Sequence, residues 1–328
     1  MKNEKKAIAP FIKHFSDSRS MMLDVIIALF PALIWGVYVF GFRALIITLV
    51  SVISAVLSET LFELNTGRKI TVTDLSAVVT GMLLAFCLPV SVPLYVPALG
   101  SAFAIIIVKM IFGGIGKNFM NPALGGAAFL TIAFPQYMTR FTKPFEKISA
   151  FAINISDKEI SGIIDSISLT ELKTGDSLSS NKVTELLIGR VCGNIGEISA
   201  AMLLLGLVYL LIKRVVSVHI PVSFALTVFL IGFFFPRASA EPITVSLYEL
   251  LSGSVILISC FMATDQVTSP LTPYGKIIFG VGCGALTMLI RSYGAFNEGA
   301  VFAVLIMNVF VYFIDKLTAP AVFGGGRR

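Results

Sequence analysis

Five ionisable residues lie within, or at the ends of, long apolar stretches, where a charge is costly and is often functional. They are Glu59, Asp74, Lys109, Glu197 and Asp265. A carboxylate in such a place can bind a cation or carry a proton, and an amine can neutralise a carboxylate or bind an anion. These residue types therefore favour ligand binding and transfer across a membrane over bond cleavage.

Most of these charges also have an explanation that needs no ligand. Asp74 and Glu197 stand at the starts of predicted helices, where free N–H groups and the helix dipole favour an acid. Lys109 is late in its apolar stretch and is long enough to reach the membrane surface. Asp265 differs, because Thr264-Asp265 closes a predicted helix and the dipole disfavours an anion there. We therefore expect a cation, a partner lysine or a ligand beside Asp265.

The glycine-rich link at 113–122 (GGIGKNFMNP) is the most unusual connection in the sequence. Its three glycines permit positive φ and close backbone approach, and Pro122 suits the first turn of the next helix. A link of this kind leaves polar groups such as Asn118 and Asn121 near a helix start, where an anionic or polar ligand can bind. The GxxxxGK[ST] phosphate-binding pattern is absent. A tight interhelical turn is the equal alternative.

The composition indicates a membrane protein. The chain has 328 residues, of which 56% are hydrophobic and 13% charged, whereas soluble domains carry about 25% charged residues. Apolar stretches near the length of a transmembrane helix recur throughout. The net charge of +6 is explained by basic cytoplasmic links, so we expect no nucleic-acid partner. The first 20 residues lack the apolar core of a cleavable signal peptide.

Cysteine and histidine spacing gives no sign of a metal site. Neither His14 nor His219 has a neighbour that would complete a triad or a metal ligand set. The four cysteines are far apart and form no CxxC pair, which makes them packing residues or, alternatively, members of a cluster shared with partner subunits. They lie at positions 87, 192, 260 and 283.

We predict an all-α polytopic fold with about ten transmembrane helices. Lys and Arg collect in alternate links, which places both chain ends in the cytoplasm under the positive-inside rule. The predicted spans are 23–40, 44–62, 74–90, 95–113, 121–135, 195–212, 219–235, 243–262, 276–291 and 298–315.

A polar segment at 136–190 divides the chain into two halves. Five spans precede it and five follow it, so a duplication would make the second copy inverted. Asn121-Pro122-Ala123 and Asn297-Glu298-Gly299 open the fifth span of each half in a similar way. The predicted parts are a cytoplasmic N-terminal segment (1–22), a first half (23–135), an extracytoplasmic loop (136–190), a second half (191–315) and a cytoplasmic tail (316–328).

Several long stretches resemble the RnfD subunits of the Rnf complexes, the ion-translocating ferredoxin:NAD oxidoreductases, and more distantly the NqrB subunits of the sodium-translocating NADH:quinone reductases. The resemblance implies a multi-pass subunit of the bacterial cytoplasmic membrane that works with other complex subunits. Such a complex couples electron transfer to movement of Na⁺ or H⁺. The matching stretches are MLDVIIALFPALIWGVYVFG (22–41), TVTDLSAVVTGMLLAFCLP (71–89), GKNFMNPALGGAAFL (116–130), FPQYMTR (134–140), IGEISAAMLLLG (195–206) and FMATDQVTSPLTPYGKIIFGVGCGALTMLIR (261–291).

The resemblance also implies a covalently attached FMN in the polar segment. In the family, FMN is joined to a threonine in a motif close to D-x-x-S-G/S-A-T-P-L-x-x-L-K. Here the corresponding stretch is Asp165–Lys173 (DSISLTELK), and about four residues of the motif are missing between Ser168 and Leu169. The nearest hydroxyls are Thr170 and then Ser168, so these are the candidate attachment sites. The alternative is that this chain carries no covalent FMN.

The cytoplasmic links suggest a second site. We predict that Asp74, Asn118, Asn121, Thr264 and Asp265 line a polar site on the cytoplasmic side, for a non-covalent flavin or an ion. Two other functions stay open at this point. One is a secondary transporter or channel-like subunit without redox chemistry, and the other is a membrane scaffold without its own cofactor.

Overall fold

The computed structural model describes residues 18–146, 148–150, 180–238, 240–294 and 298–320, and every regular element among them is helical. The first part of the chain forms α1 (Ser18–Phe40), α2 (Phe42–Thr66), η1 (Val72–Asp74), α3 (Ser76–Phe86), α4 (Tyr95–Phe103), η2 (Ala104–Met110), α5 (Pro122–Ala133) and α6 (Pro135–Met138). The second part forms α8 (Ser180–Ile188), α9 (Ala200–Ile212), α10 (His219–Phe234), α11 (Pro242–Leu251), α12 (Val255–Leu257), η3 (Ile258–Met262), α13 (Pro273–Tyr293) and α14 (Ala300–Thr318).

Glycine and proline set the helix boundaries. Gly41, at φ 80°, separates α1 from α2, and Gly67 ends α2 in the left-handed conformation, which L residues adopt only at a cost. Pro122, Pro242 and Pro273 each occupy the first turn of a helix, where the missing N–H costs nothing. The links between helices are therefore fixed by local sequence.

Four helices among the described residues are long and apolar enough to cross a membrane, namely α1, α2, α13 and α14. The pair formed by α11 and the α12–η3 segment is a fifth if a bend of 61° is allowed. Each of the ten predicted spans contains a helix or this bent pair, but several predicted boundaries are wrong. The span expected at 74–90 is helical only over Ser76–Phe86, and the span expected at 195–212 becomes helical only at Ala200.

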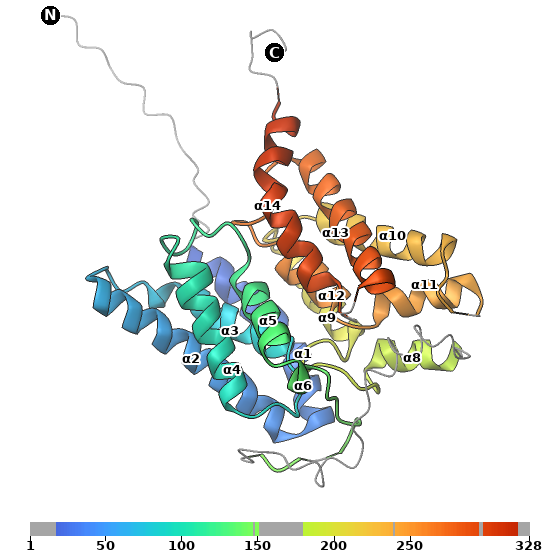
Figure 1. Ribbon diagram of the computed structural model, residues 1–328, viewed down its shortest axis with the longest axis horizontal. Coiled ribbons are helices and arrows are strands. Elements are labelled where there is room, and N and C mark those ends of the chain that lie inside the picture. The colour runs from blue at the N-terminus through green and yellow to red at the C-terminus, as the bar shows by residue number, and fades with distance from the viewer. Residues whose placement is uncertain (1–17, 147, 151–179, 239, 295–297, 321–328) are drawn as a thin grey trace, which may run out of the picture.

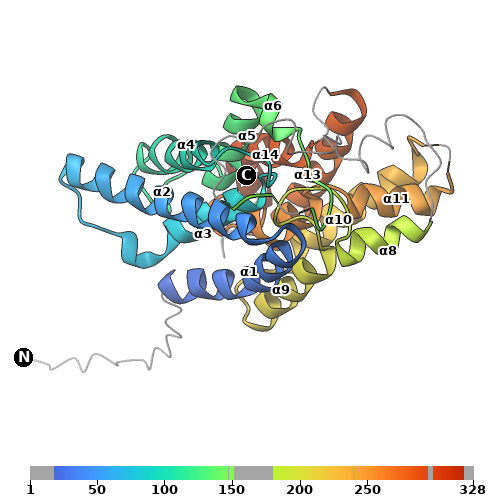
Figure 2. The same cartoon turned by 90° about the horizontal axis from the view of Figure 1, so that it is seen from below.

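The helices of the two halves pack in matching ways. α2 packs against α3 and α4, and α10 packs against α11 and α13. The halves meet where α1 contacts α9 and where α5 contacts α14. Figure 1 shows α2 to α5, in blue to green, on one side of the molecule and α10 to α14, in orange to red, on the other. In Figure 2, from below, α1 lies beside α9.

Short helix α3 is the centre of the first half. All its residues except Val78 are buried, so it is surrounded by protein rather than lipid. The chain on both sides of α3 is irregular, and buried irregular backbone is tolerated in membrane proteins where other protein groups satisfy it or where it lines a cavity. Here Ile195 N donates to Leu88 O at 3.0 Å and Gly196 N donates to Phe86 O at 3.0 Å. The second half thus completes the backbone hydrogen bonds of the first.

Candidate functional site

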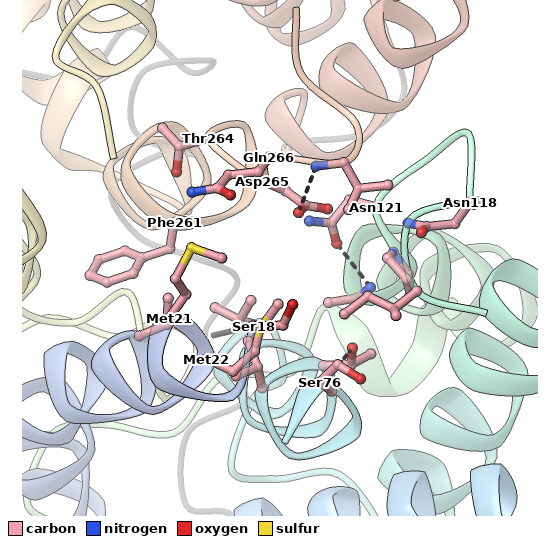
Figure 3. A pocket seen from close by; sticks show the side chains of 18 of the residues that line it. Ser18, Met21, Met22, Ser76, Asn118, Asn121, Phe261, Thr264, Asp265 and Gln266 are labelled. Carbon is pink, nitrogen blue, oxygen red and sulfur yellow. Dashed lines mark hydrogen bonds between the residues drawn. The ribbon is translucent and has the colours of Figure 1, made fainter. Parts of the chain in front are cut away.

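A cavity of about 350 Å³ lies between the two halves. Its walls come from the start of α1, the start of α3, the glycine-rich link before α5 and the link after η3. Figure 3 shows these segments converging, with Asn118 and Asn121 on one side and Thr264, Asp265 and Gln266 on another. Four of the five residues predicted for the cytoplasmic-side site therefore line one pocket.

Asn121 fixes the junction between the halves at this pocket. Its Oδ1 accepts hydrogen bonds from Ala123 N (3.0 Å) and Leu124 N (3.2 Å), which caps α5. Its Nδ2 donates to Met262 O, at the end of η3, at 3.1 Å. Asn118 Nδ2 donates to Met120 O at 3.0 Å. Both asparagines thus hold the shape of the pocket wall through the backbone.

Thr264 and Asp265 follow η3 on the opposite wall. Thr264 Oγ1 donates to Cys260 O at 2.8 Å. Asp265 accepts hydrogen bonds from Val267 N at 3.3 Å and from Thr268 Oγ1 at 3.2 Å. Burial raises the pKa of the Asp265 carboxyl above its usual value, and these two hydrogen bonds oppose that rise. No described lysine or arginine pairs with Asp265, so its local partners are a backbone amide and a hydroxyl.

Asp74 does not line the cavity but acts on it through Ser76. Asp74 Oδ1 accepts from Ser76 N at 2.8 Å and from Ser76 Oγ at 2.6 Å. Ser76 does line the cavity, and its hydroxyl also accepts from Lys109 Nζ at 2.6 Å. Asp74 therefore orients a hydroxyl that lines the pocket. It was predicted to line the pocket itself, but it contacts the pocket only through Ser76.

Lys109, one of the five ionisable candidates, lines the pocket although it was not among the residues predicted for the cytoplasmic-side site. Its side chain is buried at 2% exposure and does not extend to the membrane surface. Its Nζ lies 2.8 Å from Glu59 Oε1 and 2.9 Å from Glu59 Oε2, so the two form a buried ion pair. Lys109 lies on η2, a π-helical segment, and such segments often occur at functional sites. The signal in the sequence was a lysine in one apolar helix and a glutamate in the helix packed against it.

The remaining wall of the pocket is apolar. It includes Met21 and Met22 of α1, Leu83 of α3 and Phe261 of η3. A cavity with one apolar wall and a few polar groups suits a planar organic ligand with a polar edge. Among the described residues, no three His, Cys, Asp or Glu side chains group as metal ligands, and the four cysteines are buried and free. The predicted FMN attachment sites, Ser168 and Thr170, lie outside the described residues.

Comparison with known proteins identifies the family. A model of the NQR2, RnfD, RnfE family matches residues 5–324. The chain belongs to this family. It is 41% identical over 318 residues to the D-type subunit of the Na(+)-translocating ferredoxin:NAD(+) oxidoreductase complex of Acetobacterium woodii, covering 96% of this chain and 94% of the relative.

Two further relatives carry related names. The D-type subunit of the proton-translocating ferredoxin:NAD(+) oxidoreductase complex of Clostridium ljungdahlii is 35% identical, with 97% of this chain and 96% of the relative covered. The D-type subunit of the ion-translocating oxidoreductase complex of Stutzerimonas stutzeri is also 35% identical, with 94% and 92% covered. The likeness extends over nearly the whole of each protein, so it includes both halves and the pocket between them.

Proposed function

We propose that this chain is the D-type membrane subunit of an ion-translocating ferredoxin:NAD⁺ oxidoreductase complex. The observation that carries the proposal is the near full-length similarity to relatives that bear this name. Electron transfer and movement of Na⁺ or H⁺ are then activities of the assembled complex, in which this chain works with other subunits. The relatives are named for different ions, one for Na⁺ and one for protons, so family membership alone does not choose between them.

We propose ten membrane passages in two inverted halves, with both ends in the cytoplasm of a bacterial cell. Each predicted passage contains a helix, and the matching helix contacts of the two halves support a duplication. The pocket, the start of α1 and the end of α14 lie on one side: Ser18 lines the pocket, and Thr272, in the link after η3, hydrogen-bonds to Thr318. This arrangement supports a cytoplasmic-side pocket, with the 136–190 loop on the other side of the membrane.

We propose that the pocket holds a non-covalent flavin, with an ion as the alternative ligand. The donor set fits the ring system, because Lys109 and Ser76 lie at a polar edge and Met22, Leu83 and Phe261 form an apolar wall. A bound flavin would supply one- or two-electron carrier chemistry. The Lys109 ammonium would stabilise negative charge at the polar edge. The apolar wall would exclude water, which strengthens that electrostatic contribution.

Pocket-filling substitutions on α1 test the flavin proposal. Val25 lines the cavity, whereas Ile27, on the same helix, is 43% exposed on the outer surface of the chain. Val25→Trp should remove one equivalent of acid-extractable flavin from the purified complex, while Ile27→Trp should retain it. Equal flavin content in the two variants would exclude the cavity as the flavin site. A complex without any flavin assigned to this chain would favour the transporter or scaffold function.

Covalent FMN on Thr170 or Ser168 stays a family-based proposal, and it is tested separately. Mass spectrometry of the intact subunit, taken from assembled complex, should show the polypeptide plus one FMN phosphoester. Thr170→Val should remove that added mass if Thr170 is the acceptor, and Ser168→Ala should remove it if Ser168 is. A mass equal to that of the bare polypeptide would show that this chain has lost the tether.

A further inference from the structure

A second polar cluster lies away from the flavin pocket, where three breaks in the helices meet. Glu197 is in the irregular segment before α9, Ser254 is at the bend between α11 and α12, and Glu298 comes just before α14. Gly253, at φ 67°, makes the bend possible, and a Cβ there would overlap Glu298 Oε1. Irregular backbone buried in a membrane protein commonly marks an ion site. The arrangement brings two carboxylates to one hydroxyl.

The hydrogen bonds of this cluster require one more positive charge. Ser254 Oγ lies 2.7 Å from Glu197 Oε2 and 2.8 Å from Glu298 Oε2. A hydroxyl has a single proton, so it donates to only one of two ionised carboxylates. The other short oxygen–oxygen contact needs a proton on a carboxyl group or a cation between the oxygens. The backbone N–H groups do not supply it, because Asn194 N donates to Glu197 Oε1 and Ser254 N donates mainly to Glu298 Oε1.

The charged residues around this cluster also lack one positive charge. Arg291 lies next to the cluster, since its Nη2 would be 2.9 Å from a Cβ on Gly253. Its Nη1, however, donates to Glu249 Oε2, and Arg237 binds the other oxygen of Glu249. Among the described residues here, three carboxylates thus face two guanidinium groups. One monovalent cation would balance the charge.

Asn194 presents a side-chain oxygen that has no hydrogen-bond partner in the part of the chain that the structure describes. The residue is 4% exposed, and its side-chain amide lies against the Glu197 carboxyl group. Among the described residues nothing donates to its Oδ1. An amide oxygen buried without a donor is costly, and it is a good ligand for a hard cation such as Na⁺. This free acceptor is independent of the two carboxylates and indicates the same kind of ligand.

We propose that Glu197, Ser254 and Glu298 form a site for one monovalent cation, a proton or Na⁺, with Asn194 Oδ1 completing the oxygen ligands when Na⁺ is bound. The site is distinct from the flavin pocket, and it is built from the second half of the chain. Exchange of the cation would change the charge of this largely buried cluster by one. The chain would then contribute a binding step to ion movement by the complex.

Infrared spectroscopy of the purified complex tests the site without relying on its activity. In Na⁺-free buffer near neutral pH, the wild-type complex should show the carbonyl band of one protonated carboxyl group. Glu197→Gln and Glu298→Gln should each abolish that band, because the remaining carboxylate can ionise and accept the Ser254 proton. Ser254→Ala should keep the band, since two carboxylates still face each other. Glu241→Gln, at an exposed glutamate, is the matched control and should change nothing.

Adding Na⁺ at constant pH identifies the cation. Loss of the band would show that Na⁺ replaces the proton, and a band that persists until the pH is raised would show a proton site. Absence of the band from the Na⁺-free wild type, or its retention in both glutamine variants, would overturn the proposal. Co-purification of the partner subunits confirms that each variant is folded. The result is independent of flavin content, so failure here and failure of the flavin pocket are distinguishable.

Discussion

Each half of the chain buries an ion pair, and the two pairs differ in what surrounds them. In the first half, Lys109 on η2 binds Glu59 on α2. In the second half, Arg291 on α13 and Arg237 both bind Glu249 on α11. Each half also has an arginine that donates to a backbone carbonyl near a helix end: Arg68 donates to Met110 O at the end of η2, and Arg237 donates to Arg291 O near the end of α13. The packing is similar, but the chemistry is not.

The arginine cluster is closed, whereas the lysine pair borders a cavity. Arg291 is fully buried, and its guanidinium donates to Glu249 O at 2.6 Å and to Ser252 O at 3.0 Å as well as to the carboxylate. These contacts lock the end of α13 onto the α11–α12 bend. Lys109 instead donates to Ser76, and both residues line the pocket. The comparison teaches that one buried charge is enclosed by the packing of its own half, whereas the other lies at the wall of a cavity.

Removal of the Glu249 carboxylate should give the largest loss of stability. Glu249→Ala leaves two arginines in the interior without their counter-ion, and breaking a buried pair in this way costs about 3–5 kcal/mol. Thermal unfolding of the detergent-solubilised protein or complex measures the effect. Glu241→Ala, on an exposed residue at the start of the same helix, should be close to neutral. Equal stability of the two variants would refute a structural role for the arginine cluster.

The ion pair between Lys109 and Glu59, beside the pocket, should lose less stability on substitution than the Glu249 cluster. Glu59→Gln should cost about 1–3 kcal/mol, since lysine can become neutral in apolar surroundings and arginine cannot. The double variant Glu59→Leu with Lys109→Met should recover much of this loss, because an apolar pair replaces a buried ion pair without leaving a charge. The same double variant should release the non-covalent flavin. Full flavin retention in a stable double variant would contradict a role for Lys109 in binding.

The smallest expected effect is the contribution of Asp265 to the pH dependence of stability. Burial raises its pKa in the folded state, so its contribution to stability is present when the carboxyl group is protonated. That contribution is lost as the pH rises through the raised pKa. Asp265→Asn should therefore gain stability relative to the wild type as the pH rises from about 4 toward neutrality. Thermal unfolding across this range checks the sign, and the exposed Glu185→Gln should follow the wild type at every pH.

The sequence predicted the positions of the helices better than their lengths. Each predicted apolar stretch contains a helix or the bent pair, but hydropathy cannot distinguish a lipid-facing helix from α3, which is short and surrounded by protein. The predicted pocket residues Asn118, Asn121, Thr264 and Asp265 come together because two irregular links meet at the junction of the halves. The ion pair of Lys109 could not be predicted because its partner, Glu59, lies 50 positions earlier in the chain, and a sequence pattern does not reveal which distant residues are close in space.

The Glu197 cluster was also hidden from the sequence. Glu197 was one of the five ionisable candidates, with a helix start as the alternative explanation, and Ser254 and Glu298 had no individual signal. Glu298 entered only through the comparison of the two Asn-containing helix starts, and Asn297 lies outside the described residues. Asn121 lines the pocket between the halves, and Glu298 belongs to the carboxylate cluster. Breaks in hydrophobic segments are the feature that could have directed attention to both.

The contact between Asn121 and α14 has a consequence for biogenesis. In the orientation that satisfies its amide, Asn308 of α14 accepts from Asn121 N and donates to Thr268 O, each at 3.1 Å. The pocket wall is therefore complete only when the last helix of the chain has been inserted. Loading of the proposed flavin would then follow synthesis of nearly the whole polypeptide, and a chain truncated before α14 would reach the membrane without a finished pocket. Retention of the proposed flavin would therefore report that the whole chain has been inserted.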